Sequence, residues 1–555
     1  MTETSPADLR LAAQTHLREG RAQDAATAYA ALIAAEPHAP DLRYGLGAAL
    51  TALGDEAGAT DAWSTARVFH GLALLRELGV DMDRFAADPA YAAETGRSLI
   101  ANGLPGVAGA VLARAVEGLG PERQLVTDYA VALLHQGALE EACDALTLVA
   151  EEDEAALAPL LMAAHSFADD NGLRRAFVAR QAGAALEAAT DTLDIAPPAS
   201  PGGRALKIGY LPGAAPIDLR YLAVIANHDA MRIDPLLIVE TAQAAPEGFA
   251  AQVIGGLSDT EAAQAIAALG LDVLVDLSGP AGGRLGVFAH RAAPVQVMWN
   301  SDFASTGLSR IDAKFLPAGV TERDVAILFS ESRMAVGPVL APWRAVEIAP
   351  RTPGRRFTFG AFMPPALMTP PLLDAVAKVL LARPEARLML KHAVMDDPVI
   401  QRVLAAQFLS RGVARERLDF RSLSGDEMDA FDFETVDLAI DSRPSMGEAQ
   451  VLTFLGHGVP VLCVGEPTTQ GGLAVAPLVA LGLHELTVVS FKHMVTRALE
   501  LHDRPERLAA LRGKIEAAFA GSAYNDVRRV AGDLQRCYEI LVGEKAASAA
   551  SAAVA

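Results

Sequence analysis

Short apolar runs alternate with longer stretches of mixed polarity from residue 206 onward. The runs that indicate strands are residues 206–212, 235–240, 272–277, 295–299, 357–363, 387–392, 436–441 and 460–465. Strands that are apolar along their whole length, each followed by a helical stretch, indicate parallel sheets covered by helices on both faces. The pattern relaxes around residues 341–354. We therefore predict two Rossmann-like domains, at 206–345 and 346–545, with a ligand cleft at the carboxyl ends of their strands.

The residues before 195 follow a pattern that repeats every 34 positions. Paired at this shift are Pro6 with Pro40, Gly20 with Gly54, Ala25 with Ala59, Tyr29 with Trp63, Gly103 with Gly137, and Ala108 with Ala142. This period is typical of the tetratricopeptide helix–turn–helix unit, in which a glycine allows the turn and an aromatic residue fills the groove against the next unit. We predict an α-helical tetratricopeptide repeat domain over 1–195, with units near 6–39, 40–73, 89–122 and 123–156. A plain helical bundle is the alternative.

A Pro- and Gly-rich stretch, residues 196–205, is the clearest linker, because prolines and paired glycines cannot continue a helix. A repeat array performs no chemistry itself; its concave face holds an extended peptide or a partner protein. The Ala- and Ser-rich tail at 546–555 is expected to be disordered.

The 555-residue chain carries 47 basic and 68 acidic residues, a net charge of −21. Such a surface argues against a nucleic-acid partner, because counterion release needs clustered Lys and Arg. Three cysteines fit neither a disulfide framework nor a zinc cluster, and we expect no metal or other cofactor. The N-terminus lacks the features of a signal peptide, and the longest apolar runs end before the roughly 18 residues of a membrane span. These features predict a soluble, cytoplasmic, multidomain protein.

In the first block, candidate chemistry gathers where the strand at 272–277 ends. Asp276 occupies the carboxyl end of that strand, and the Gly-rich turn that follows, residues 278–286, includes Gly279 and Arg284. Backbone amides of such a turn can hold a phosphate or a sugar hydroxyl. The turn matches neither G-x-G-x-x-G nor the P-loop, so an ordinary turn in which Asp276 satisfies loop amides is about as good an interpretation.

In the second block, residues 436–450 place five polar side chains around a strand end and a helix start: Asp441, Arg443, Ser445, Glu448 and Gln450. A turn before a helix N-terminus is where a nucleotide phosphate or ribose would lie. Glu448 could accept hydrogen bonds from a ribose diol, or merely favour the helix dipole. Lys391 and His392 end a neighbouring strand and face the same crevice, or form a solvated strand end.

The segment FAHRAAPVQVMW at 288–299 resembles a stretch of the O-GlcNAc transferase and SPINDLY family, glycosyltransferase family 41. In register with that stretch are Phe288, Ala289, Arg291, Ala293, Pro294, Gln296, Met298, Trp299, Thr306 and Gly307. Residues 441–461 resemble the segment that leads into the family's donor-binding helix, with Asp441, Gly447, Leu455, Gly458 and Pro460 in place. The resemblance implies a GT-B architecture of two Rossmann-like domains that glycosylates protein side chains while the repeats hold the acceptor.

The chain departs from the family where the donor's diphosphate would bind. Pro364 and Leu367 stand where relatives that use a uridine-diphosphate sugar have Gln and Lys, and residues 448–451 replace a His-Thr-Thr-Gly turn. A lysine of the base pocket is replaced near Asp426, and an early histidine has no match in residues 211–222. Losing a lysine that neutralises a diphosphate weakens charge-assisted binding. A donor with one phosphate, such as CMP-activated pseudaminic or legionaminic acid, needs fewer cations and suits similar bacterial proteins that glycosylate flagellin.

From the residues and the resemblance we expect a protein glycosyltransferase that transfers such a sugar to Ser or Thr of flagellin or another protein. The donor-binding candidates are Gly279, Arg284, Pro364, Lys391, Leu423, Ser424, Ser445, Gly447, Glu448 and Gln450. An inverting transfer needs a base for the acceptor hydroxyl, and Asp276 is the first choice, with Asp218 second. Two alternatives stay open: a transferase that uses a UDP- or GDP-sugar, and a non-catalytic adaptor whose repeats recruit a client.

Overall fold

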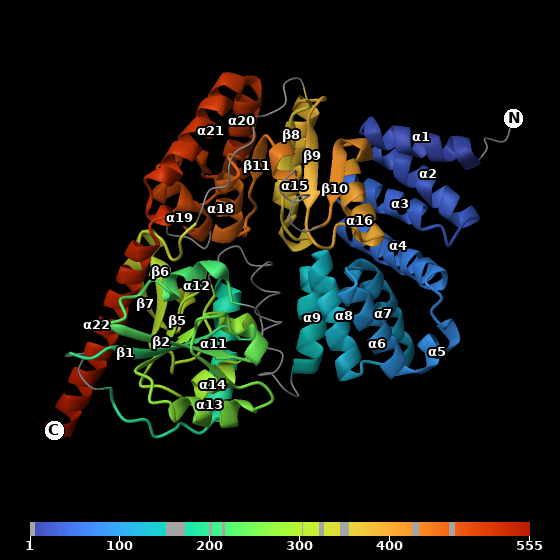
Figure 1. The fold of residues 1–555 in the computed structure, drawn as a ribbon. Helices are drawn as coiled ribbons and strands as arrows, with labels where there is room; N and C mark the ends of the chain where they lie inside the picture. The colour runs from blue at the N-terminus through green and yellow to red at the C-terminus, as the bar shows by residue number, and fades with distance from the viewer. Residues whose placement is uncertain are drawn as a thin grey trace, which may run out of the picture.

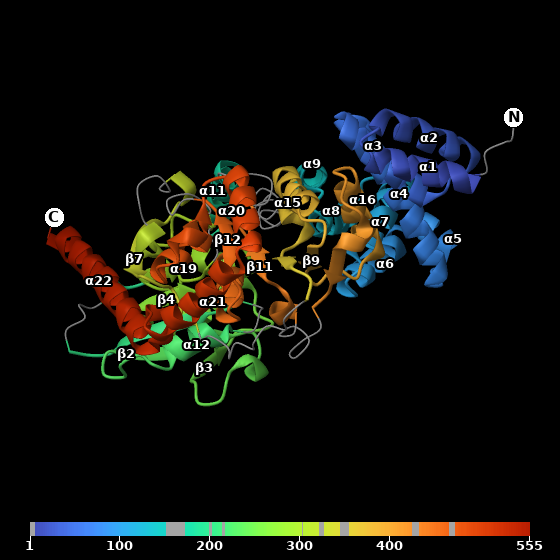
Figure 2. The same ribbon diagram turned by 90° about the horizontal axis from the view of Figure 1, so that it is seen from above.

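The computed structural model describes residues 6–150, 172–198, 203–213, 217–282, 284–301, 304–320, 327–343, 355–423, 432–465 and 472–554. Figure 1 shows a helical array in blue and cyan, a first sheet domain in green, and a second sheet domain in yellow and orange. Figure 2 shows from above that the array stands beside the second sheet domain, and that the last helix runs back along the first.

Helices of the array follow one another as packed pairs joined by short turns. They are α1 (Pro6–Arg18), α2 (Ala22–Ala35), α3 (Pro40–Leu53), α4 (Glu56–Glu77), α5 (Met82–Ala87), α6 (Pro89–Ala101), α7 (Pro105–Leu119), α8 (Arg123–Gln136) and α9 (Leu139–Ala150). Gly20, Gly54, Gly103 and Gly137 each lie in the turn within a pair, with φ between +75° and +79°. Only glycine adopts this left-handed conformation without strain, so the predicted turn glycines are confirmed.

Close helix contact in the array depends on small residues opposite large ones. The ring of Tyr29 lies against Gly45 and the ring of Trp63 against Gly47, where any added side chain would overlap. Tyr29 of the first unit packs on Gly45 of the second, as predicted, whereas Trp63 packs on Gly47 of its own unit, so the predicted contact with the next unit is confirmed only for Tyr29. The end of the fourth predicted unit, residues 151–156, lies outside the described residues.

The first sheet is parallel throughout, in the order β3-β2-β1-β4-β5-β6-β7. Its strands are β1 (Leu206–Leu211), β2 (Ile233–Val239), β3 (Ala251–Val253), β4 (Val273–Asp276), β5 (Val295–Met298), β6 (Ala313–Pro317) and β7 (Ser332–Gly337), with helices α12 (Leu219–Ile225), α13 (Asp259–Ala267) and α14 (Leu285–Ala289). Val273 and Val275 enter one apolar cluster and Leu274 the other, so both faces are buried, as the unbroken apolar run predicted.

The second sheet repeats this topology, in the order β10-β9-β8-β11-β12-β13. Its strands are β8 (Thr358–Ala361), β9 (Arg387–Lys391), β10 (Leu418–Arg421), β11 (Leu438–Ile440), β12 (Val461–Val464) and β13 (Thr487–Val488). Its helices are α15 (Pro370–Ala382), α16 (Pro398–Leu409), α18 (Glu448–Gly456), α19 (Gly472–Ala480), α20 (Phe491–Asp503) and α21 (Pro505–Ala520). The two Rossmann-like domains of the sequence analysis are confirmed.

Two helices cross the predicted boundaries. Helix α22 (Val527–Val554) leaves the second domain and packs on the first, where Lys545 donates to Asp312 at 3.1 Å. It continues through the Ala- and Ser-rich tail, so the prediction of disorder at 546–555 is wrong as far as Val554, because alanine favours helix once a helix has begun. Helix α11 (Leu173–Ala188), placed with the repeats from sequence, lies against the first sheet through Leu186 and Glu187.

One buried carboxylate joins the array to the second domain. Asp397, fully buried before α16, accepts hydrogen bonds from the amides of Gly106 and Val107 at the start of α7, at 2.7 and 3.2 Å. Its other oxygen accepts from the amides of Val399 and Ile400, at 2.8 and 3.2 Å. Asp397 thus satisfies orphan amides at the ends of two helices and fixes the array against the domain that carries α16.

Candidate active site between the two sheets

The strand order reverses once in each sheet, and both reversal points carry a carboxylate. In the first sheet β1 and β4 are neighbours, and Asp276 at the end of β4 lies opposite Leu211. In the second sheet β8 and β11 are neighbours, and Asp441 directly follows β11. Parallel α/β sheets bind ligands in the crevice at such points. The fold therefore places these two residues, both selected from sequence, where a ligand is expected.

The two oxygens of Asp276 have different surroundings. Oδ1 accepts hydrogen bonds from the amides of Ser278 and Gly279, both at 2.9 Å, and from the Ser278 hydroxyl at 3.0 Å. Oδ2 is buried and has no hydrogen-bond partner in the part of the chain that the structure describes. Burial raises the pKa of Asp276, and the Gly279 and Ser278 hydrogen bonds oppose that rise. One oxygen thus organises the turn, and the other is left to accept a proton.

A buried lysine lies beside this turn. Lys314 on β6 is fully buried and donates to the main-chain and side-chain oxygens of Asn300. A side chain on Gly279 would come within 2.6 Å of the Asn300 amide nitrogen, and φ of +64° also favours glycine there. Gly279 is therefore needed for the turn, and its own amide already donates to Asp276.

Asp218, the second-choice base, caps helix α12. It accepts from the Arg220 amide at 2.8 Å and from the Arg220 guanidinium at 2.9 Å. Burial raises the pKa of Asp218, but the hydrogen bonds and charge of Arg220 outweigh that effect and lower it overall. Because a carboxylate with a lowered pKa is a weaker base, the geometry favours Asp276.

Contacts from Arg220 connect the two lobes. Its guanidinium lies 4.6 Å from the centre of the Trp343 ring, within cation–π range. The Trp343 amide donates to the Tyr524 carbonyl at 2.8 Å, and the Tyr524 hydroxyl donates to Glu448 at 3.1 Å. The charge of Arg220 also lowers the pKa of Glu448 directly. The start of α12 in the first lobe is thereby coupled to the start of α18 in the second.

Glu448 is the first residue of α18 and is 4% exposed. Burial raises its pKa to about 7, against the opposing effects of Tyr524 and Arg220. A carboxyl group that is about half protonated near neutral pH can donate as well as accept a hydrogen bond. The first amides of a helix have no intrahelical partner, so this end of α18 offers a ligand both amides and a carboxyl group.

Asp441 organises the loop before α18. It accepts from the Ser445 hydroxyl and from the Met446 amide, both at 2.8 Å, and burial raises its pKa to about 7. The Ser445 hydroxyl in turn accepts from the Gly447 amide at 3.1 Å. Gly447 has φ of +91° and no atom lies within 4 Å of where its side chain would start, so the helix start faces open space. Ser445 and Gly447 thus shape the loop, and Gln450 follows on the first turn of the helix.

The two cations among the donor-binding candidates are already paired. Arg284 donates to Glu240 at 2.7 Å and to Asp259 at 2.8 Å, and these partners raise its pKa. Lys391 is 2% exposed and forms a buried ion pair with Asp432, so the solvated strand end considered from sequence is wrong. Their donor-binding roles stay predictions.

The remaining candidates lie around the second sheet's carboxyl edge or beyond what the structure describes. Pro364 precedes a short turn in which Leu367 is buried, and Leu423 is 57% exposed after β10. His392 is largely buried, which lowers its pKa to about 4, with a smaller effect from His135 of the array. Ser424 and Asp426 lie outside the described residues.

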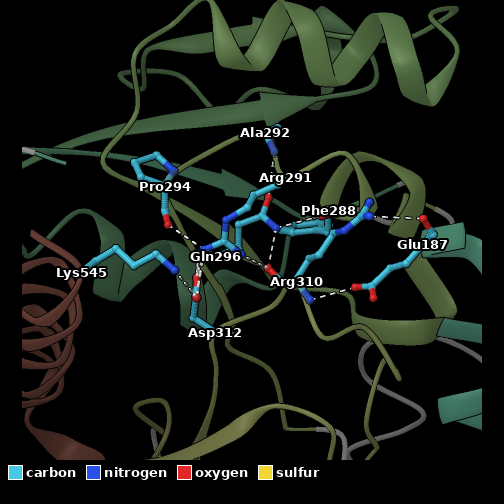
Figure 3. Close-up of polar contacts among 9 residues, drawn as sticks. All are labelled: Glu187, Phe288, Arg291, Ala292, Pro294, Gln296, Arg310, Asp312 and Lys545. Atoms are coloured by element: carbon cyan, nitrogen blue, oxygen red, sulfur yellow. Dashed lines mark hydrogen bonds and ion pairs between the residues drawn. The ribbon is translucent and has the colours of Figure 1, made fainter. Parts of the chain in front are cut away.

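Arg291 and Gln296, two of the residues that carry the resemblance, fix a loop of the first lobe (Figure 3). Arg291, at φ of +57°, donates to the Arg310 carbonyl and to both carboxylate oxygens of Asp312, all at 2.9 Å. Gln296 is fully buried and donates to the same Arg310 carbonyl at 2.9 Å. Lys545 reaches this group from α22. These side chains therefore hold the loop at residues 310–312 against β5 and α22.

Three residues that connect the two lobes escaped the sequence analysis: Arg220, Trp343 and Tyr524. Trp343 and Tyr524 are far apart in the chain, and only folding brings them together, through the hydrogen bond from the Trp343 amide to the Tyr524 carbonyl. Arg220 follows Asp218 closely after a predicted strand, so its position at a strand-to-helix junction was a usable signal.

The architecture, a helical repeat array in front of two Rossmann-like domains, is that of a GT-B glycosyltransferase fold preceded by repeats. A solved structure of an O-GlcNAc transferase variant from Thermobaculum terrenum matches 99% of this chain and 100% of its own, with a TM-score of 0.74 and 23% identity. No protein-family model matches the chain.

Curated relatives point to the same group of proteins. The chain is 28% identical over 301 residues to the SPINDLY protein of Oryza sativa subsp. japonica, described as a probable UDP-N-acetylglucosamine–peptide N-acetylglucosaminyltransferase. The match covers 51% of this chain and 32% of that relative. The SPINDLY protein of Arabidopsis thaliana is 28% identical over 282 residues, 48% of this chain and 30% of its own. The chain thus spans about a third of the length of these relatives. The sequence similarity itself supports the expected resemblance to SPINDLY and O-GlcNAc transferase proteins. Among the described residues, no helix is both long and apolar enough to cross a membrane.

Proposed function

We propose that the chain is a protein O-glycosyltransferase, which transfers a sugar from a nucleotide-sugar donor to a hydroxyl group of an acceptor protein. The observation that carries this proposal is the chain of contacts from Arg220 through Trp343 and Tyr524 to Glu448. It connects the start of α12, after β1, with the start of α18, after β11, at the reversal points of the two parallel sheets. The similarity to SPINDLY proteins and to an O-GlcNAc transferase fold supports the same reaction class.

In the proposed reaction the acceptor hydroxyl oxygen attacks the anomeric carbon, and the bond from that carbon to the donor's phosphate oxygen breaks. Asp276 takes the hydroxyl proton on Oδ2, the oxygen that has no partner among the described residues. The amides at the start of α18 stabilise the charge that develops on the leaving phosphate. Glu448, near half protonation, hydrogen-bonds the donor.

For the donor we propose a CMP-activated nonulosonic acid such as pseudaminic acid, and for the acceptor Ser or Thr of flagellin or of another protein held by the repeats. The cations Arg220, Arg284 and Lys391 each pair with a carboxylate, so a donor with a single phosphate demands less of the site than a diphosphate. The names of the curated relatives instead favour UDP-N-acetylglucosamine, which makes the donor the first question to test.

Thermal stabilisation by millimolar CMP, UDP and GDP separates the donors. Stabilisation by CMP alone supports the nonulosonic acid, and stabilisation by UDP or GDP alone replaces it with an ordinary sugar nucleotide. An intact-mass assay with flagellin and the matching donor then tests transfer. Asp276→Asn should abolish the mass increase, whereas Asp218→Asn, which keeps a good helix cap, should retain it. An acceptor whose mass never changes with any of these donors contradicts the transferase and favours the adaptor.

A further inference from the structure

A cavity lies between the first two repeats and the second lobe. It has a volume of about 960 Å³ and is walled by α1, α2, α3 and α4 on one side and by α16 and the segment after it on the other. These elements stand side by side in Figures 1 and 2. The volume is near the top of the range of roughly 300–1,000 Å³ that is typical of ligand pockets. None of the residues that line it is among those described above at the candidate active site.

Four arginines line this cavity, against two acidic residues: Arg10, Arg18, Arg402 and Arg415, with Asp41 and Glu416. Arg10 already pairs with Asp41 at 3.2 Å. Arg18 and Arg402 are exposed, one from each side, and neither forms an ion pair within the described ranges. A positive cavity on a chain whose net charge is −21 selects an anionic ligand, because the rest of the surface repels it.

Two polar atoms of the cavity wall lack partners among the described residues. The Tyr44 hydroxyl is one, on a side chain that is only 4% exposed, and Nδ1 of His70 is the other. Burial raises the pKa of Tyr44 and lowers that of His70, and the charge of Arg402 acts on both residues with a smaller lowering effect. An unpaired buried hydroxyl is costly, and a ligand oxygen placed here would accept its hydrogen bond.

Apolar residues alternate with these polar groups. Leu42 on the array and Ala405 and Leu409 on α16 line the same cavity. We propose that the cavity binds an acidic peptide segment, with carboxylates between Arg18 and Arg402 and on the Tyr44 hydroxyl, and apolar side chains on the leucines. The inner faces of repeat arrays hold extended peptides, which favours a peptide over a small anion. The inference rests on the proposed function only in assigning the segment to an acceptor protein.

Binding of fluorescently labelled peptides to the full chain tests this site without donor or transfer. A 12-residue peptide of alternating Glu and Leu should bind, measured by fluorescence anisotropy, at least tenfold more tightly than its Gln–Leu counterpart. Arg18→Glu and Arg402→Glu should each weaken binding at least tenfold. The matched control is Arg76→Glu, an exposed arginine of α4 that does not line the cavity, and it should leave binding unchanged.

Tyr44→Phe serves as a second probe that is safe for folding, since it removes a hydroxyl that the described residues leave unpartnered. It should weaken binding of the Glu–Leu peptide several-fold and leave the melting temperature of the protein unchanged. Equal binding of the two peptides, or unchanged binding to the Arg18 and Arg402 variants, would overturn the proposal. Tighter binding of an oligonucleotide of equal charge, lost in the same variants, would overturn the peptide as ligand. If the wild-type chain binds the Glu–Leu peptide but shows no transfer activity with any donor, only the proposed function is refuted, and the peptide site stands.

Discussion

Replacing Glu448 with glutamine tests the near-neutral pKa of its buried carboxyl group. The ordinary value of 4.5 is raised to about 7, chiefly by burial. Between these two values the folded protein keeps a proton that the unfolded chain has released. The free energy of unfolding therefore falls as the pH rises from 4.5 to 7, and the loss is complete above the folded-state pKa. Glutamine has nearly the same shape and does not titrate, so the variant lacks this loss.

The size of the effect follows from the same shift. From pH 5.5 up to the folded-state pKa of about 7, the wild-type chain covers about 1.5 pH units in which only the folded state holds the proton. At about 1.36 kcal/mol per unit, its free energy of unfolding falls by about 2 kcal/mol by pH 8.0. Asp441, whose pKa is also about 7, titrates in both proteins and cancels from their difference. The stability of Glu448→Gln relative to wild type should therefore rise by about 2 kcal/mol over this range.

Urea unfolding followed by tryptophan fluorescence, at several pH values from 5.5 to 8.0, measures this difference. Glu506→Gln, at an exposed residue in the first turn of α21, is the matched control and should run parallel to wild type. If Glu448→Gln also runs parallel to wild type, the carboxyl group is ionised throughout the range. The half-protonated donor contact proposed for the start of α18 would then be refuted.

Three further substitutions test the frame around the site. Gly307→Ala should lower the free energy of unfolding by more than 3 kcal/mol, because the methyl group overlaps the Ala179 carbonyl and φ is +79°. The control Gly521→Ala, where the methyl group enters open space, should change the free energy of unfolding little in the same chemical unfolding assay. Asp397→Ala should loosen the contact between the array and the second lobe, because four amides lose their acceptor. Limited proteolysis should then cleave the chain faster between the repeats and the second lobe, and an unchanged cleavage rate would contradict the role of this junction. Lys391→Met should lower stability by about 3–5 kcal/mol in a melting or urea series by stranding Asp432, and a neutral effect would contradict the buried pair.

Uniformly apolar strands and the 34-residue period were enough to predict the repeat array and both Rossmann-like domains. Periodicity alone missed strands β3, β7, β10 and β13, which form the edges of the two sheets in the described part of the chain. Polar residues interrupt the first three, and β13 is only two residues long. In β6 the buried Lys314 broke the apolar pattern, although Asn300 satisfies its ammonium group. The helical end of α22, residues 546–554, was missed because composition cannot show that the earlier residues of the same helix already supply the nucleus.

At the site, residue type and strand position were sufficient to select Asp276, Asp441 and Glu448. Sequence could not tell which cations would be available, because a charge is cancelled by partners that lie far away in the chain. Arg284 is neutralised by Glu240, which precedes it by 44 residues, and the partner of Lys391 lies 41 residues after it. Contacts of this kind decide the electrostatics of the crevice, and they exist only in the folded chain.

The return of α22 to the first domain has a consequence for synthesis. Tyr538 on this helix is fully buried against Tyr210 and Phe315 of the first sheet, with ring centres 6.5 and 5.6 Å apart. A ribosome delivers the array, the first sheet and the whole second domain before it delivers Tyr538. Until α22 is synthesised, the face of the first sheet that Tyr538 covers, with Tyr210 and Phe315, is therefore exposed on the nascent chain. A chain that ends before α22 would keep this apolar face accessible to chaperones and proteases.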